Sequence, residues 1–441
     1  MTQLVDKNMV TEEFLLRYNT SLEEREQEPE ALVKYREEAL ANFLETGFPT
    51  RKEEEYKYFD ISKKLVDKFD FAREAGAKVV AEQDFRQFLL PDLDANVLVF
   101  VNGKLAIEHS KLVSPEEQVT IHGLAGAVKE DPAKIADLLS KTTLKEDPFY
   151  NLNASVATDG AYIEVHKNAV VDKPIMLYFF TDSREEKAVA YSKNIFNIAD
   201  NAQVSVIETF HNIGNDDSFA SASTEVFVGR NAHVDYYKVQ ADNEKAFQVN
   251  STHVYQGADS VSNVVTVSLD GAMVRNNLNF VLNGTGIEAN MYGLSLLDSQ
   301  TAVDNHTSVD HKFPHCESNE LYKGIYDGKS KGVFNGKIFV REDAQKTNAF
   351  QANNNILLSD DATINTKPQL EIWADDVKCS HGCTNGQIAD EQLFYLKSRG
   401  IGAEKARAML LMAVAEDVVN KINDEVLKNH ISAIIAQRLM K

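Results

Sequence analysis

A short motif recurs along the middle of the chain and restricts the folds open to it. The motif is Asn or Asp, then Ala, one variable residue and a β-branched residue, and it begins at positions 168, 201, 231 and 361. Short runs rich in Val, Ile, Tyr and Phe, which are typical of strands, extend from about residue 95 to about residue 375. Because the first three motifs lie about thirty residues apart, they indicate the stacked coils of a solenoid.

Asparagine suits the corners of such coils, because it tolerates a left-handed backbone and its amides can stack as ladders. We therefore expect the asparagine-rich stretch 351–372 to supply corners as well. The run at 95–101 leads into Asn102-Gly103, which predicts a β-hairpin. An antiparallel β-sandwich remains the alternative fold, since short strands alone do not distinguish the two.

Helical patterns flank the β-rich region. Leu32, Tyr35, Ala39 and Phe43 lie three or four positions apart and form one apolar stripe, which ends before Gly47. No long helical period is expected between the two flanks. The sequence thus predicts three parts, which are an N-terminal helical region at 1–92, a mainly β core at 93–385 and a C-terminal helical domain at 386–441.

Two amphipathic segments after Gly400 form most of the C-terminal domain. Two interpretations of their apolar faces stay open. They can pack on each other as a helical hairpin, or they can form a docking surface for another subunit. The apolar residues are Met409, Leu410, Val418, Ile422, Val426, Leu427, Ile434 and Ile435.

Composition argues against several classes of protein. A net charge of −21 disfavours a nucleic-acid surface, because phosphate binding needs clustered Lys and Arg. No apolar run approaches the roughly 20 residues that a membrane helix needs. The N-terminus lacks the pattern of an export signal, and three cysteines cannot form a disulfide framework, so we expect a cytoplasmic protein. The nucleotide-binding P-loop motif is also missing.

The stretch 373–388 holds the first candidate site, with Cys379, His381 and Cys383 within five positions. If this stretch is extended, Cys379 and His381 lie on the same face. A thiolate and an imidazole there could share a metal ion or an iron–sulfur species. The pair is two ligands short of a closed zinc site, and a buried strand cysteine beside a satisfied histidine is the structural alternative.

A second group comprises His306, His311, His315 and Cys316, with Pro314 disfavouring a helix through it. On strands, His311 and His315 would share one face, while His306 and Cys316 would lie on the other. A metal site needs converging ligands, so ordinary positions in the coils are favoured.

Scattered Asp and Glu residues also allow a β-helix polysaccharide lyase or hydrolase as the alternative function. The missing export signal and the single tryptophan, Trp373, count against it.

Four stretches, 47–62, 310–340, 346–388 and 393–419, together closely resemble the SufB/SufD family of the SUF iron–sulfur cluster assembly system. The first stretch and the length of 441 residues are similar to the SufD branch rather than the SufB branch. The resemblance implies a right-handed parallel β-helix between N-terminal and C-terminal helical domains.

The resemblance also implies a function. It describes a non-catalytic scaffold subunit that supports de novo iron–sulfur cluster assembly and iron acquisition. Such a subunit pairs with a SufB-like paralogue through edge strands of the β-helix and binds a SufC-like ATPase through its C-terminal helices. It binds no cofactor alone and shares a transient iron–sulfur cluster at the interface. A flavin in the complex, and a homodimer without the paralogue, are left open.

Residue by residue, the resemblance assigns His381 to the cluster-assembly interface as a shared, transient iron or cluster ligand, with Cys379 beside it on the strand. Family members usually carry a small residue such as Ala where this chain has Cys383, so that thiol is either incidental or an added ligand. The ATPase-docking surface would include Met409, Leu410, Val418 and Ile422.

Overall fold

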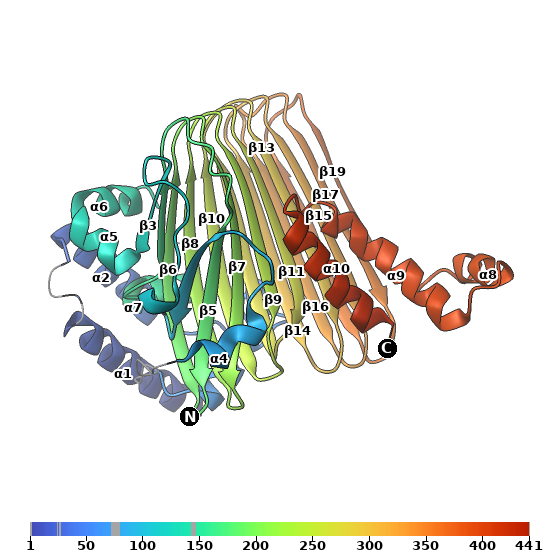
Figure 1. The fold of residues 1–441 in the computed structure, drawn as a ribbon, viewed down its shortest axis with the longest axis horizontal. Helices are drawn as coiled ribbons and strands as arrows, with labels where there is room; N and C mark the ends of the chain where they lie inside the picture. The colour runs from blue at the N-terminus through green and yellow to red at the C-terminus, as the bar shows by residue number, and fades with distance from the viewer. Residues whose placement is uncertain (1, 24, 26–27, 72–79, 143–146, 441) are drawn as a thin grey trace.

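The middle of the chain is a parallel β-solenoid with helices at both ends (Figure 1). From β4 (Ala161–Val165) onward, successive strands alternate between two facing sheets, and from β5 (Ile175–Ser183) onward each strand pairs in parallel with the strand one coil earlier. This confirms the predicted solenoid and excludes the antiparallel sandwich. The computed structural model describes residues 2–23, 25, 28–71, 80–142 and 147–440.

Sheet A contains ten strands and sheet B nine among the described residues. The strands of sheet A are β1 (Asn96–Val101), β2 (Lys104–Leu105), β5 (Ile175–Ser183), β7 (Gln203–Gly214), β9 (His233–Ala241), β11 (Val261–Asp270), β13 (Glu288–Leu297), β15 (Glu317–Tyr326), β17 (Asn348–Leu357) and β19 (Lys378–Gly386). Those of sheet B are β3 (Val119–Gly123), β4 (Ala161–Val165), β6 (Ala188–Ile198), β8 (Ser218–Val228), β10 (Ala246–Gln256), β12 (Met273–Leu282), β14 (Ala302–His311), β16 (Lys331–Val340) and β18 (Thr363–Ile372).

The recurring motif forms one corner of the coils. Asn168, Asn201 and Asn231 have φ values of 64°, 60° and 53°, in the left-handed region that Asn tolerates. Their amides form a ladder, because Nδ2 of Asn201 donates to Asn168 Oδ1 and Nδ2 of Asn231 donates to Asn201 Oδ1, each at 2.9 Å. The predicted ladder is therefore confirmed for these three. The motif at Asp361 precedes a strand of the other sheet and does not extend it.

Between the sheets, side chains of one kind stack from coil to coil. Phe100, Phe179 and Phe210 lie in register on β1, β5 and β7, with ring centroids 4.9 Å and 5.0 Å apart. Each stacked aromatic pair contributes about 0.5–1.5 kcal/mol beyond the burial of its surface. The hydrophobic core is therefore continuous along the axis of the solenoid.

The start of the solenoid is closed by antiparallel pairs. β1 turns at Asn102 and Gly103, with φ values of 51° and 79°, and pairs with β2, as the hairpin prediction requires. The sequence predicts no long helical period inside the core, and the structure has three short helices there, between β3 and β4, that were not predicted. They are α5 (Leu124–Glu130), α6 (Pro132–Ser140) and α7 (Pro148–Val156).

The N-terminal helices cover the outer face of sheet B. The predicted helix with the apolar stripe is confirmed as α2, and it ends before Gly47, whose φ is 69°. Phe43 and Phe149 pack with Phe219 and Phe247 of the sheet in one hydrophobic cluster. The helical elements on this face are α1 (Thr2–Glu23), α2 (Glu30–Thr46), η1 (Glu54–Tyr56) and α3 (Ile61–Lys68). The short α4 (Glu82–Phe85) and η2 (Arg86–Phe88) instead pack on sheet A, and η3 (Ile107–His109) follows β2.

The C-terminal helices α9 (Ala403–Val419) and α10 (Glu425–Leu439) lie on the outer face of sheet A, whereas α8 (Asp390–Ser398) projects away from the solenoid (Figure 1). Val418 and Ile422 are buried against sheet A, so their assignment to an ATPase-docking surface needs correction. The amphipathic pattern could not distinguish a partner protein from the chain's own sheet. In the described part of the chain, no helix is both long and apolar enough to cross a membrane.

We expect Asn201→Ala to destabilise the protein by about 1–3 kcal/mol, because Ala resists a left-handed backbone and loses both amide bonds of the ladder. Asn201→Gly keeps the backbone conformation and loses only the side-chain bonds, so its effect should be smaller. Urea unfolding of the two variants measures the difference. Equal or reversed effects would contradict this account of the corner.

Candidate functional site

The solenoid ends with two open strand edges. Among the described residues, β19 pairs only with β17, and β18 pairs only with β16, so each strand has one side without a neighbouring strand. Backbone donors and acceptors on such an edge can pair with strands of another chain. The predicted site residues of 373–388 lie on or beside β19 (Figure 1).

Alternation along β19 turns Cys379, His381 and Cys383 toward the space between the two sheets. Cys379 packs among interior apolar side chains near Ala349. Cys383 Sγ lies 3.0 Å from Oγ1 of Thr366 on β18. His381 lies between them on the strand, exposed at the open end, and makes no hydrogen bond or ion pair with the described residues. The same-face prediction therefore holds. The alternative of a buried cysteine beside a satisfied histidine does not, because Cys379 is only half-buried and the histidine has no hydrogen-bond partner among the described residues.

The side chains of Cys379, His381 and Cys383 differ in burial, and therefore in how well each could bind a metal ion. The pKa of the Cys379 thiol is raised, mainly by burial, although the backbone N–H of Ala349 lowers it. A raised pKa keeps this sulfur protonated and makes it a weak ligand. The His381 ring and the Cys383 thiol are both exposed, so both can reach a ligand-binding partner or a metal ion. The described residues contain no group of three or more His, Cys, Asp and Glu placed to hold a metal ion. The arrangement is thus an incomplete ligand set.

Asparagines hold the edge strand to its neighbour. Nδ2 of Asn354 donates to Thr384 Oγ1 at 2.7 Å, and Nδ2 of Asn355 donates to Asn385 Oδ1 at 2.8 Å. These asparagines lie within β17, so the expectation that this stretch forms a corner is wrong for them. Their side-chain amides instead form hydrogen bonds from β17 to the edge strand β19, in the same way as the asparagine ladder at the corners.

The four residues of the second candidate group do not converge. The ring of His311 is buried and bonds Ser318 at 2.9 Å, and the buried Cys316 thiol bonds the carbonyl of Gly284 at 3.2 Å. His315 has φ of 61° at a corner of the coil, and His306 faces the N-terminal segment on the other side of sheet B. The interpretation as ordinary coil positions is therefore favoured over a metal site.

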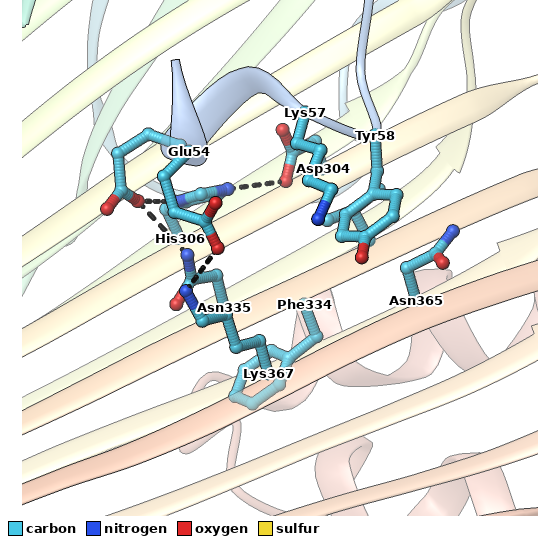
Figure 2. Close-up of a pocket in the computed structure, with 11 residues that line it drawn as sticks. Glu54, Lys57, Tyr58, Asp304, His306, Phe334, Asn335, Asn365 and Lys367 are labelled. Carbon is cyan, nitrogen blue, oxygen red and sulfur yellow. Dashed lines mark hydrogen bonds and ion pairs between the residues drawn. The ribbon is translucent and has the colours of Figure 1, made fainter. Parts of the chain in front are cut away.

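His306 instead contacts a segment that we call the strap, defined as residues 54–56, which lies across the outer face of sheet B (Figure 2). The Glu55 carboxylate bonds His306 on β14 at 3.1 Å and Asn335 on β16 at 3.0 Å, and it pairs with Lys337. Glu54 pairs with Lys367 on β18 at 2.5 Å. The strap therefore ties the N-terminal region to the last strand of sheet B.

A pocket of about 10 Å³ lies beneath the strap, enough for about one water molecule. A substrate site there is therefore not supported. In the sequence, residues 47–62 stand out only for their resemblance to the SufB/SufD family. Three consecutive glutamates before Tyr56 were the signal that acidic groups gather there, but their basic partners lie more than 250 positions later.

We expect Glu55→Gln to destabilise the protein by about 1–2 kcal/mol, with Glu37→Gln on an exposed face of α2 as the control. The bond to His306 is the largest influence that lowers the pKa of Glu55, to about 2, from an ordinary 4.5. A lowered carboxylate pKa stabilises the fold above pH 4.5, and this stabilisation disappears as pH falls toward 2. The difference between wild type and Glu55→Gln in denaturant unfolding should therefore shrink in acid. A difference that persists unchanged at low pH would contradict the role of the strap.

Comparison with known proteins identifies the class. The profile described as "SUF system FeS cluster assembly, SufBD core domain" matches residues 179–414, and "SufBD protein N-terminal region" matches residues 10–177. The chain therefore belongs to the SufBD family of iron–sulfur cluster assembly proteins, as the resemblance indicated. This membership does not favour the polysaccharide lyase alternative.

Within the family, the chain is a homologue of SufD. It is 32% identical over 402 residues to the iron–sulfur cluster assembly protein SufD of Escherichia coli, covering 91% of each chain. It is 30% identical over 403 residues to an iron–sulfur cluster assembly SufBD family protein of Synechocystis, covering 90% of this chain and 88% of that protein.

Proposed function

We propose that this chain is a non-catalytic scaffold subunit that pairs with a SufB-like paralogue and supports de novo iron–sulfur cluster assembly, including iron acquisition. The observation that carries this proposal is the exposed His381 on an edge strand that has no neighbour on one side among the described residues. An edge strand gains backbone hydrogen bonds when a partner strand is added. Pairing of a partner strand with this edge would also place metal-binding residues of the partner opposite the His381 imidazole.

The chemistry of the site suits shared ligation. A neutral imidazole nitrogen binds iron, and thiolates bind both iron and clusters. This chain offers the accessible imidazole of His381, and the partner would complete the coordination of iron and sulfide, which are the substrates. An incomplete ligand set of this kind binds iron or a cluster weakly, which is useful for a subunit that must release the cluster.

We assign the ATPase contact to α8 and the start of α9, in place of the buried residues expected from the sequence. Phe394 is 73% exposed, Tyr395 is 61% exposed, and none of the residues of α8 is buried. Exposed Met409 and the partly exposed Leu410 lie on the following helix. A projecting helix with exposed aromatic side chains is typical of a protein–protein contact. A SufC-like ATPase is the partner that the family resemblance supplies.

The proposed location is the cytoplasm. Three free cysteines, of which Cys383 is exposed, suit a reducing compartment.

We expect His381→Ala to abolish loading of iron–sulfur clusters on the complex co-expressed with the paralogue and the ATPase, because the accessible imidazole is lost. Subunit association, measured by co-purification, should remain. Cys383→Ala is the matched control on the same strand face, and we expect it to load clusters normally. Full loading by His381→Ala would refute the assigned role of the ring.

We expect Phe394→Ser to weaken ATPase binding at least tenfold while pairing with the paralogue is unchanged, because one buried aromatic anchor typically contributes more than about 1 kcal/mol. Ile107→Ser is the control, since Ile107 is an exposed apolar residue near the other end of the solenoid. Titration of the purified ATPase onto each variant gives the affinity. Equal affinities would place the ATPase elsewhere.

A further inference from the structure

A column of three side chains leads from the interior of the solenoid to His381. Glu320 on β15 pairs in register with Gln351 on β17, and Gln351 pairs in register with His381 on β19. Side chains in register on adjacent strands point to the same side, about 4.8 Å apart. Both Glu320 and Gln351 are 3% exposed, so the column is buried up to its last member.

Hydrogen bonds to Glu320 set the orientation of the Gln351 side-chain amide in this column. Thr307 Oγ1 donates to Glu320 Oε1, and Gln351 Nε2 donates to Glu320 Oε2 at 2.6 Å. Burial raises the pKa of Glu320 to about 7, although the hydrogen bonds from Thr307 and Gln351 lower it. The carboxylate form only accepts hydrogen bonds, so with these two donors it holds the amide nitrogen of Gln351 toward itself. The amide oxygen, Gln351 Oε1, therefore lies away from Glu320. It is buried and has no hydrogen-bond partner among the described residues.

The packing around Gln351 leaves room for this arrangement. Gly336 lies on the facing sheet, and a Cβ added there would lie 2.1 Å from Gln351 Nε2. Any larger residue at position 336 would displace the amide. An acceptor buried without a partner is unfavourable, and a native structure that keeps one calls for an explanation.

We propose that Gln351 is a positioning residue for His381, and that its Oε1 accepts the N–H of the imidazole. The exposed ring reaches the neighbouring amide by rotation about its own side-chain bonds. With one nitrogen protonated and bonded to Gln351, the other nitrogen keeps its lone pair free for iron. This inference rests on the proposed function of His381. It adds that the tautomer and orientation of the ring are set from inside the solenoid, through Glu320.

A hydrogen bond from the second nitrogen of a metal-binding histidine orients the ring and makes it a better ligand, and loss of such a bond typically lowers metal affinity or activity about 10- to 100-fold. Gln351→Met keeps the size of the side chain and removes both polar atoms. Glu320→Gln frees the Gln351 amide to reverse, so that an N–H group faces the ring.

The test exploits an exchange of the two side chains. The double variant combines Glu320→Gln with Gln351→Glu. In this variant the amide at position 320 accepts a hydrogen bond from Thr307 and donates one to the carboxylate at position 351. That carboxylate still presents an acceptor oxygen to His381. We expect Gln351→Met and Glu320→Gln each to reduce the rate of cluster loading on the complex at least tenfold. The exchange should recover most of that loss. Thermal midpoints and co-purification with the paralogue identify any variant that fails to fold or pair.

The outcomes separate this inference from the proposed function. Normal loading by Gln351→Met, while His381→Ala loads nothing, would overturn the positioning role and leave the scaffold role standing. An exchange variant that folds and pairs but loads no better than Gln351→Met would also overturn it. Normal loading by His381→Ala would reject the proposed function itself, and with it this inference.

Discussion

Parallel pairing from one coil to the next is the constraint on which the structure depends. Each strand satisfies its backbone donors and acceptors on the coils before and after it, so a solenoid must end somewhere with groups that no further coil can satisfy. At its start, the antiparallel β1–β2 and β3–β4 pairs meet this need. At its other end, β18 and β19 are left with open edges in the described part of the chain. The same open edge carries the accessible histidine, so an architectural requirement and the chemistry coincide.

The N-terminal region and the site are linked more closely than their positions in the chain indicate. The strap binds three consecutive strands of sheet B through side chains and reaches the edge strand β18 through the Glu54–Lys367 pair. On the other side of the solenoid, α9 and α10 cover sheet A. Helical regions from both ends of the chain therefore stiffen the coils next to the open edge, while the side chains at the end of β19 stay accessible.

Repetition made the core predictable from sequence. A motif that places a left-handed asparagine at three successive corners favoured stacked coils, and Asn102-Gly103 and the stripe ending at Gly47 each report a local conformation that few residues allow. The helices α6 and α7 were missed although Asp-Pro precedes each one, and Asp131 and Asp147 cap them by accepting from backbone N–H groups. Their short lengths hid them among the strands.

Features that depend on contacts between residues far apart in the chain could not be predicted from the sequence. The sequence shows that Val418 is apolar, but not whether it faces a partner or the chain's own sheet. Glu55 and Lys337 are 282 positions apart, and the bond of Gln351 to Glu320 depends on a register that only the folded coil sets. The same-face placement of Cys379 and His381 was predictable because it follows from strand alternation alone.

The central claim is that a partner chain covers the edge at β18 and β19. Amide hydrogen exchange of the full chain, alone and with the SufB-like paralogue, tests it most directly, because unpaired edge strands exchange quickly and a paired strand is protected. The account predicts strong new protection at residues 363–372 and 378–386, with little change in the interior coils. Unchanged exchange at both strands in a complex shown to have formed would contradict it.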